Sequence, residues 1–179
     1  MPLYEDKDQF LRQASRQALW RRGRATRLVS LGRAEIERLL PHRDPFLLLD
    51  AITAIDYEQE AIEGIRRIDP EDPVLAGHFP GKPIYPGVLL IEMMGQLGVC
   101  MIGLQSRKDK DEDFTDPAPP DVRLFRIHAS VFFAPVMPGD EVTLRALALE
   151  SNGLTVVFAG QVSRGETHCA AAVMEGYFG

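Results

Sequence analysis

The chain has 179 residues, of which 45% are hydrophobic and 26% are charged, and its formal net charge is −6. This length and composition suit one soluble globular domain, and the negative charge argues against non-specific nucleic-acid binding. The charge is uneven, because residues 1–30 hold seven Lys or Arg and only three acids. Such an asymmetry is typical of a docking surface for a charged partner or of a solvated tail.

Cysteine usage and the N-terminal sequence bear on the compartment. Cys100 and Cys169 lie in apolar surroundings without CxxC spacing, so neither a disulfide framework nor a zinc site is expected. The sequence MPLYEDKDQF has no apolar signal-peptide core, and its early acids argue against an organelle transit peptide. We therefore expect a cytoplasmic protein.

The N-terminal part favours helices. Residues 8–20 repeat apolar positions at helical spacing, and Ser30 is a candidate cap for a short helix through AEIERLL that Pro41 would end. We expect residues 1–30 to form a basic helical extension and residues 31–179 to form the main domain.

The middle of the chain predicts two strands, an irregular segment and one long helix. FLLLDAITAID and EAIEGIRRID have strand patterns, and the prolines of segment 70–87 discourage regular structure. Pro86 and Gly87 then open VLLIEMMGQLGVCMIGL, which is too long for a typical strand and rich in Leu and Met. This run of 17 residues contains Glu92 and Gln96, so it fits a buried helix of a soluble protein better than a membrane span.

The second half of the chain predicts antiparallel strands. The charged, proline-rich segment 105–121 is expected to be a mobile loop. Four strand patterns follow, VRLFRIHASVFF, EVTLRALALES, LTVVFAGQVS and THCAAAVMEGYF, separated by the turn sequences MPGD, SNG and RGE. Strands joined by short turns pair antiparallel, and an antiparallel sheet curled around the apolar helix would bury it economically.

An acidic residue inside the apolar run is the first sign of chemistry. Glu92 and Gln96 lie four residues apart and share one helix face. Burial should raise the pKa of Glu92, and a protonated carboxyl can act as a general acid or hydrogen-bond donor. The alternative is that Glu92 pairs with a buried Arg or caps a backbone group.

Two nearby residues strengthen the chemical interpretation. His78 lies in a Gly- and Pro-rich loop that leads directly into this helix, so it could form an acid–base pair with the acid. A loop histidine satisfied by the backbone is the alternative. Gly87 at the helix start would expose free N–H groups to a thioester oxygen, although Pro86 and Gly87 are also typical of helix initiation.

Other well-known motifs are absent from the sequence. GHFPGKP is one residue too short for a phosphate loop, and Pro83 stands where Ser or Thr is needed. There is no GxSxG and no GxGxxG, and the four histidines lack metal-ligand spacing. Neither a dinucleotide nor a metal is therefore expected.

Four features carry a resemblance to a known family: LLPHRDPFLLLD (39–50), GHFPGKPIYPGVLLIE (77–92), Gln96 and PVMPGD (135–140). They resemble the FabZ-type β-hydroxyacyl-acyl-carrier-protein dehydratases, over roughly residues 35–177. Glutamate at position 92 distinguishes the chain from the related FabA-type enzymes, which have aspartate there. The resemblance implies an α+β hotdog fold for residues 31–179, in which an antiparallel sheet wraps one long central helix.

The resemblance also implies a reaction. His78 would take the α-proton of a β-hydroxyacyl thioester, and the partner subunit's Glu92 would hold or protonate the departing hydroxyl. The N–H of Gly87 would bind the thioester carbonyl, and Val88, Phe79 and Gln96 would complete the substrate site. The products are a trans-2-enoyl thioester and water, and no cofactor or metal is needed.

The implied partners are an acyl carrier protein and a second copy of the chain. The active sites of such a homodimer lie at its interface, and dimers of this family can assemble into a trimer of dimers. No nucleic acid and no membrane span are expected. The candidate carrier-docking residues are basic: Lys82, Arg21, Arg22, Arg24 and Arg27.

Some positions depart from the family pattern. His128 and Val131 stand where relatives often show Asp and Arg, and the helix reads EMMGQ. The acyl chain length and the pathway, whether fatty-acid, specialised lipid or polyketide synthesis, therefore stay open. Two other functions also remain: another hotdog thioester activity, such as a thioesterase or an enoyl-CoA hydratase, and a non-catalytic partner subunit.

Overall fold

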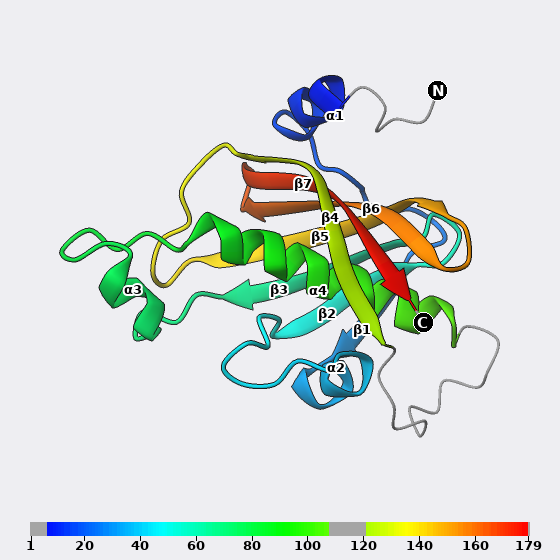
Figure 1. Ribbon diagram of the computed structural model, residues 1–179, viewed down its shortest axis with the longest axis horizontal. Coiled ribbons are helices and arrows are strands. Elements are labelled where there is room, and N and C mark those ends of the chain that lie inside the picture. The colour runs from blue at the N-terminus through cyan, green and yellow to red at the C-terminus, as the bar shows by residue number, and fades with distance from the viewer. Residues whose placement is uncertain (1–6, 108–120, 179) are drawn as a thin grey trace.

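The computed structural model describes residues 7–107 and 121–178 (Figure 1). Most of segment 105–121, predicted to be a loop, lies outside the described residues. The elements are α1 (Lys7–Ala14), β1 (Arg27–Leu31), α2 (Arg33–Leu39), β2 (Ala51–Asp56), β3 (Ala61–Arg67), α3 (Pro73–Gly77), α4 (Gly87–Gln105), β4 (Val122–Phe132), β5 (Glu141–Ser151), β6 (Thr155–Arg164) and β7 (Thr167–Phe178).

The strands form one antiparallel sheet that packs against one long helix. The sheet has seven strands in the order β1-β2-β3-β5-β6-β7-β4. Figure 1 shows α4 lying along one face of this sheet. The α+β hotdog fold predicted from the sequence is confirmed, as are the strands predicted for the second half of the chain.

Helix α4 is the core of the fold. Most of its large apolar side chains are buried. Glycines allow the helix to approach the sheet closely: a Cβ on Gly98 would lie 2.6 Å from the ring of Phe158, and a Cβ on Gly160 of β6 would lie 2.5 Å from the Cβ of Met94. The helix is long and apolar enough to span a membrane, but 72% of its most apolar window is buried inside the protein. It is therefore the buried helix that the sequence predicts.

The position of β4 differs from the prediction. The MPGD turn was expected to join neighbouring strands, but β4 pairs with β7, whereas β5 pairs with β3 and β6. Residues 133–140, which connect β4 to β5, are hydrogen-bonded to β7 and to the segment before α4: Phe133 N–H donates to Cys169 O at 2.7 Å, and Tyr85 N–H donates to Val136 O at 2.8 Å. These bonds carry the chain across the end of the sheet, so the turn does not close a hairpin.

Segment 70–87 is less irregular than predicted, because it contains the short helix α3. Pro73 occupies the first helical position, where its missing N–H costs nothing. The side chain of Asp72 caps the helix by accepting a hydrogen bond from Val74 N–H at 3.0 Å.

The N-terminal prediction is only partly right. The first helix ends at Ala14 instead of continuing to residue 20, and Ser30 lies in β1 instead of capping a helix. Helix α2 begins after Gly32, whose N–H donates to the Glu35 side chain at 2.9 Å. Because β1 pairs with β2, the sheet already includes residues on both sides of the predicted domain boundary at residue 30.

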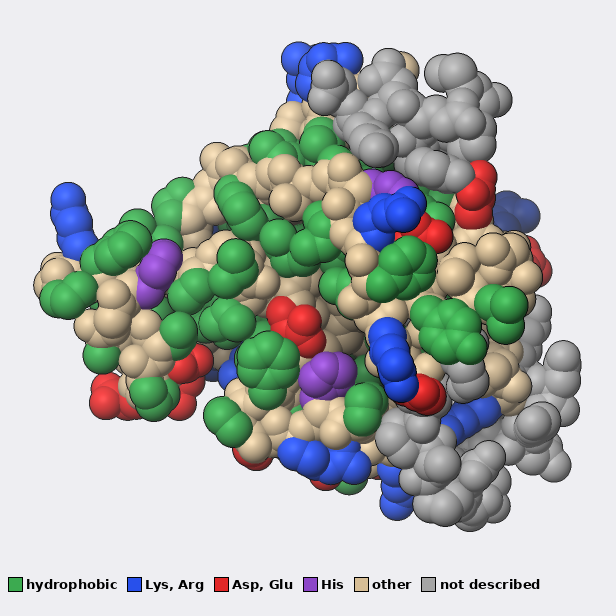
Figure 2. Space-filling model, viewed as in Figure 1, with side chains coloured by type: hydrophobic (Ala, Val, Ile, Leu, Met, Phe, Trp, Pro, Cys, Tyr) green, Lys and Arg blue, Asp and Glu red, His purple; other side chains and the backbone are tan. Residues whose placement is uncertain are grey.

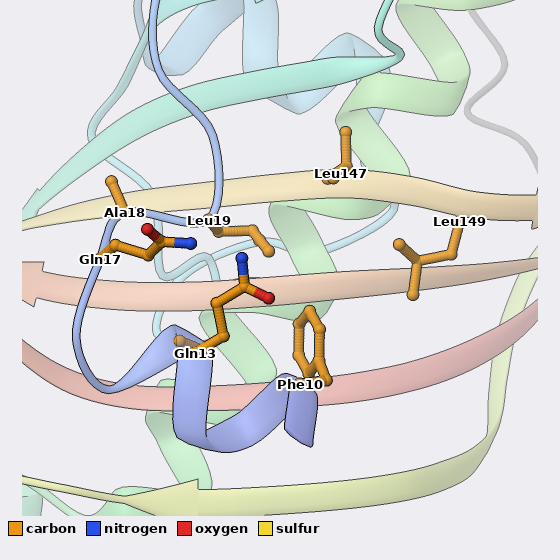
Figure 3. Close-up of a pocket in the computed structure, with 8 residues that line it drawn as sticks. Phe10, Gln13, Gln17, Ala18, Leu19, Leu147 and Leu149 are labelled. Carbon is orange, nitrogen blue, oxygen red and sulfur yellow. The ribbon is translucent and has the colours of Figure 1, made fainter. Parts of the chain in front are cut away.

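Residues 7–26, which we call the arm, pack on the sheet face opposite α4. Phe10 and Ala14 contact a cluster of outward-facing β6 and β7 side chains that alternate with those facing α4. Figure 3 shows arm residues gathered beside Leu147 and Leu149 of β5. Buried Gln161 fixes the arm, because its Nε2 donates to the carbonyls of Ala14 (2.6 Å) and Gln17 (3.0 Å) and its Oε1 accepts from Leu19 N–H (2.8 Å).

Candidate active site

Glu92 lies on the second turn of α4 and faces the segment between α2 and β2. Its Oε1 lies 3.3 Å from His42 Nε2, and it accepts a hydrogen bond from Gln96 Nε2 at 3.0 Å. The Glu92 side chain is 26% exposed, so it remains accessible from one side. Glu92 is thus held by two neighbours and is still open to a ligand.

Gln96 connects this helix face to the chain that carries His42. Its Nε2 donates to Phe46 O at 2.7 Å, and its Oε1 accepts from Leu48 N–H at 2.8 Å. The His42 ring also stacks against Phe46, with ring centroids 6.2 Å apart. Since Gln96 is almost fully buried, these bonds are shielded from water, and they fix His42 beside Glu92.

The charge state of Glu92 differs from the prediction. Burial alone would raise its pKa, as the sequence suggested. The contact with His42 has the opposite and larger effect, and together with the hydrogen bond from Gln96 it holds the pKa of Glu92 below its ordinary value. In the isolated chain Glu92 is therefore a carboxylate at neutral pH.

His78 lies between α3 and α4 with a defined tautomer. Its Nδ1 is 2.8 Å from the carbonyl oxygen of Ile84, and because a carbonyl only accepts, Nδ1 must carry the proton. Nε2 of the neutral ring is then the nitrogen that can take up a proton. The ring stacks on Phe79 with centroids 4.1 Å apart, which further limits its orientation.

His78 and Glu92 do not meet within one chain. In residues 7–107 and 121–178, no ion pair or hydrogen bond joins them. Glu92 instead lines a pocket of about 90 Å³ together with Val122 and Leu124 of β4. At the other end of β4, the Phe132 ring lies so close to Gly87 that a Cβ there would be 2.7 Å from it. Strand β4 therefore runs beside the site from the helix start to Glu92.

The surface around this site exposes several large apolar side chains, beside the charged side chains of Arg123 and Arg126. Strand β4 is an edge of the sheet, and Leu124, Phe125, Ile127 and Phe132 on it are all more than 40% exposed. Figure 2 shows hydrophobic side chains gathered over the start of α4, and a mixture of hydrophobic and charged side chains along β4. An edge strand with this much apolar surface is a ready template for pairing with another chain.

A family model described as the FabA-like domain matches residues 40–172. The chain belongs to the FabA-like family. A 3-hydroxyacyl-[acyl-carrier-protein] dehydratase FabZ of Campylobacter jejuni is 39% identical over 127 residues, which are 71% of this chain and 83% of that protein. A FabZ of Chlamydia trachomatis is 38% identical over 117 residues, which are 65% of this chain and 71% of that protein.

Solved structures share the fold of this FabA-like chain. The dehydratase heterocomplex ApeI:P from Xenorhabdus doucetiae matches with a TM-score of 0.65 and 21% identity, covering 80% of this chain and 90% of that one. A hypothetical thioesterase from Streptococcus pneumoniae, solved with coenzyme A, matches with a TM-score of 0.51 and 9% identity, covering 68% of this chain and 80% of that one. At these identities the likeness concerns the fold alone.

The FabA-like match includes His78, Gly87 and Glu92, and the structure places the other candidates around them. Gly87 is the first residue of α4, where N–H groups lack helical acceptors. Val88 and Phe79 are 68% and 54% exposed. Their roles toward substrate stay predictions, whereas the contacts of Gln96 mark it as a residue that positions Glu92.

The basic candidates lie in two places. Lys82 is exposed in the loop after His78, whereas the arginines belong to the arm and its junction with β1. Arg22 Nη2 is bound to Glu63 at 2.6 Å, and the guanidinium of Arg27 lies 5.3 Å from the centre of the Tyr57 ring. Their role in carrier docking stays a prediction.

Sequence reasoning missed the contact that His42 makes with Glu92. The residue was quoted within LLPHRDPFLLLD, the first segment of the resemblance, but no role followed from that position. Fifty residues separate it from Glu92, and only the hydrogen bonds of Gln96 reveal why they meet. The available signal was a histidine, a residue that can exchange protons near neutral pH, inside a matching motif.

We expect His42→Phe to raise the pKa of Glu92, because the ring and its stacking remain while the largest lowering contact is lost. A carboxyl with a lowered pKa stabilises the fold above its unfolded pKa, and that contribution is lost as pH falls through the folded pKa. The free energy of unfolding of the variant should therefore be about 1–2 kcal/mol lower than that of the wild type at neutral pH, and this difference should disappear in acid. Urea unfolding across this pH range measures it. If His42→Phe costs the same stability in a protein that already carries Glu92→Gln, the contact between His42 and Glu92 is not the cause.

Proposed function

We propose that this chain dehydrates 3-hydroxyacyl thioesters carried on acyl carrier protein, giving trans-2-enoyl thioesters and water in fatty-acid or related biosynthesis. The observation that carries the proposal is the pair of proton-handling groups in the matched domain: His78 with Nε2 available, and Glu92 held as a carboxylate. The relatives named FabZ dehydratases, 38–39% identical, support the same reaction.

Each group has a role that its contacts favour. Nε2 of His78 would remove the α-proton, because Nδ1 is committed to Ile84 O. The Glu92 carboxylate would accept a hydrogen bond from the β-hydroxyl and hold it for departure, and the imidazolium formed at His78 would be the proton source for that oxygen. The free N–H of Gly87 would stabilise the enolate-like thioester oxygen.

The site also needs a second copy of the chain. We propose a homodimer in which β4 of one protomer pairs with β4 of its partner and brings the partner's His78 to Glu92. Three observations support this: β4 is an edge strand, several of its exposed side chains are large and apolar, and Leu124 lines the pocket of Glu92. Further assembly into a trimer of dimers stays part of the proposal.

Carrier docking and compartment complete the proposal. Lys82 lies four residues from His78 and is exposed, so it is suited to guide an acidic carrier to the site. The arginines of the arm lie across the sheet from α4 and remain a second docking candidate. A cytoplasmic location is supported by Cys100 and Cys169, which are free and buried.

The test is a panel of 3-hydroxyacyl thioesters that varies chain length and compares acyl carrier protein with coenzyme A. We expect the absorbance of the enoyl thioester to rise without release of free thiol, and to rise faster with the carrier. Thiol release would instead indicate a thioesterase. A preference for coenzyme A would indicate a hydratase, and inactivity with tight acyl-carrier binding would indicate a non-catalytic subunit.

A further inference from the structure

A cationic cleft lies between the arm and the outer face of the sheet, away from the candidate active site. Its volume is about 540 Å³, and its basic residues come from two sources. Arg16, Arg21 and Arg22 belong to the arm, whereas Arg145 and His168 belong to β5 and β7. We call it the arm cleft.

The arm cleft carries more positive charge than its acids neutralise. Four guanidinium groups line it against two carboxylates, Glu63 and Glu166. Glu63 is fully engaged, since Arg22 binds its Oε1 at 2.6 Å and Arg145 binds its Oε2 at 2.9 Å. The two remaining guanidiniums are exposed, and no ion pair occupies either of them within the described part of the chain. This excess stands out in a chain of net charge −6.

The walls of the arm cleft are held in place before any ligand arrives. Gln161 fixes the arm through three hydrogen bonds, and Glu63, only 6% exposed, fixes the guanidiniums of Arg22 and Arg145. Trp20 also lines the cleft and is 4% exposed, and among the described residues its buried indole N–H has no acceptor. Because that N–H is already closed off from the open cleft, it belongs to the packed wall behind the cleft.

A histidine in the wall responds to this charge. His168 Nδ1 lies 2.8 Å from Ser163 Oγ, and burial followed by the positive charge of Arg145 lowers the pKa of His168. The ring is therefore neutral at pH 7, as expected in a place that disfavours further positive charge. The cleft offers hydrogen bonds and positive charge together.

We propose that the arm cleft binds a small phosphate-bearing anion. Guanidinium groups match phosphate oxygens in charge and in their paired N–H geometry. The volume of the cleft falls within the range of small-molecule sites. The proposal does not rest on the dehydratase activity, because α4 and Glu92 lie on the other sheet face.

Inorganic pyrophosphate is the probe, and Trp20 is the reporter, since it is the only tryptophan of the chain. We expect a saturable change in tryptophan fluorescence when pyrophosphate is added at constant ionic strength. Arg16→Gln and Arg21→Gln should each raise the dissociation constant at least about fivefold, because each removes a charge-assisted contact. Arg12→Gln makes the same charge change on the arm outside the cleft and should leave the constant unchanged.

Three results would overturn the proposal. One is no saturable signal beyond that of sodium chloride. Another is an equal rise of the dissociation constant in the Arg12, Arg16 and Arg21 variants, which would show that only the net charge of the chain matters. The third is an Arg21-dependent fluorescence change with apo acyl carrier protein but none with pyrophosphate, which would make the cleft a protein-docking surface. Circular dichroism confirms that each variant is folded, and no enzyme substrate is required.

Discussion

Heterodimers built from one His78→Ala subunit and one Glu92→Gln subunit should regain about half of the wild-type dehydratase activity, although either homodimer alone is inactive. If His78 of one subunit works with the partner's Glu92, the heterodimer contains one intact site and one site that has lost both groups. Each homodimer should lose about 10²–10⁴-fold in turnover, the usual contribution of a general acid–base group. Co-expression with two different affinity tags isolates the heterodimer for the enoyl absorbance assay.

A matched control reverses the expected result. Pairing a wild-type subunit with a subunit that carries both substitutions breaks one group in each shared site, so this heterodimer should be inactive. If His78 and Glu92 act within one subunit, the two heterodimers exchange their results. That exchange would contradict the shared site while leaving the dehydratase activity itself in place. The two proposals can thus fail separately.

The sequence predicts what depends on local pattern. Glycine, proline and periodic apolar residues determine where α4 and the last four strands lie, and Glu92 and Gln96 share a face because of helix geometry. The helix continues past Glu92 because its Leu and Met side chains pack against the sheet on both sides of that residue. These features require no knowledge of distant residues.

The features that were not predicted depend on distant contacts. The segment after β4 has the residues of an ordinary tight turn. However, β4 pairs along most of its length with β7, so this segment has to cross the end of the sheet to reach β5. Similarly, α1 stops early because buried Gln161 on β6 binds the carbonyls of Ala14 and Gln17. The pKa of Glu92 falls because His42 approaches it from a segment fifty residues earlier. No local pattern contains this information.

A lysine in the middle of the exposed edge should separate the protomers. Ile127 is 48% exposed and lies at the centre of β4, so antiparallel pairing of two β4 strands would bring it close to its own copy. Ile127→Lys would then place two positive charges close together between the two strands, where Arg126 already carries one on each. We expect the dimer dissociation constant to rise at least about a hundredfold, or roughly 3 kcal/mol.

Activity should follow the dimer, because one chain alone does not join His78 to Glu92. Sedimentation velocity and initial rates, measured over the same range of protein concentration, should show specific activity falling as monomer appears. Leu28→Lys provides the control: Leu28 is 69% exposed on β1, the opposite edge of the same sheet, and the substitution there should change neither quantity. A fully active Ile127→Lys monomer would show that the site is complete in one chain, and an unchanged dimer would show that the partner binds elsewhere.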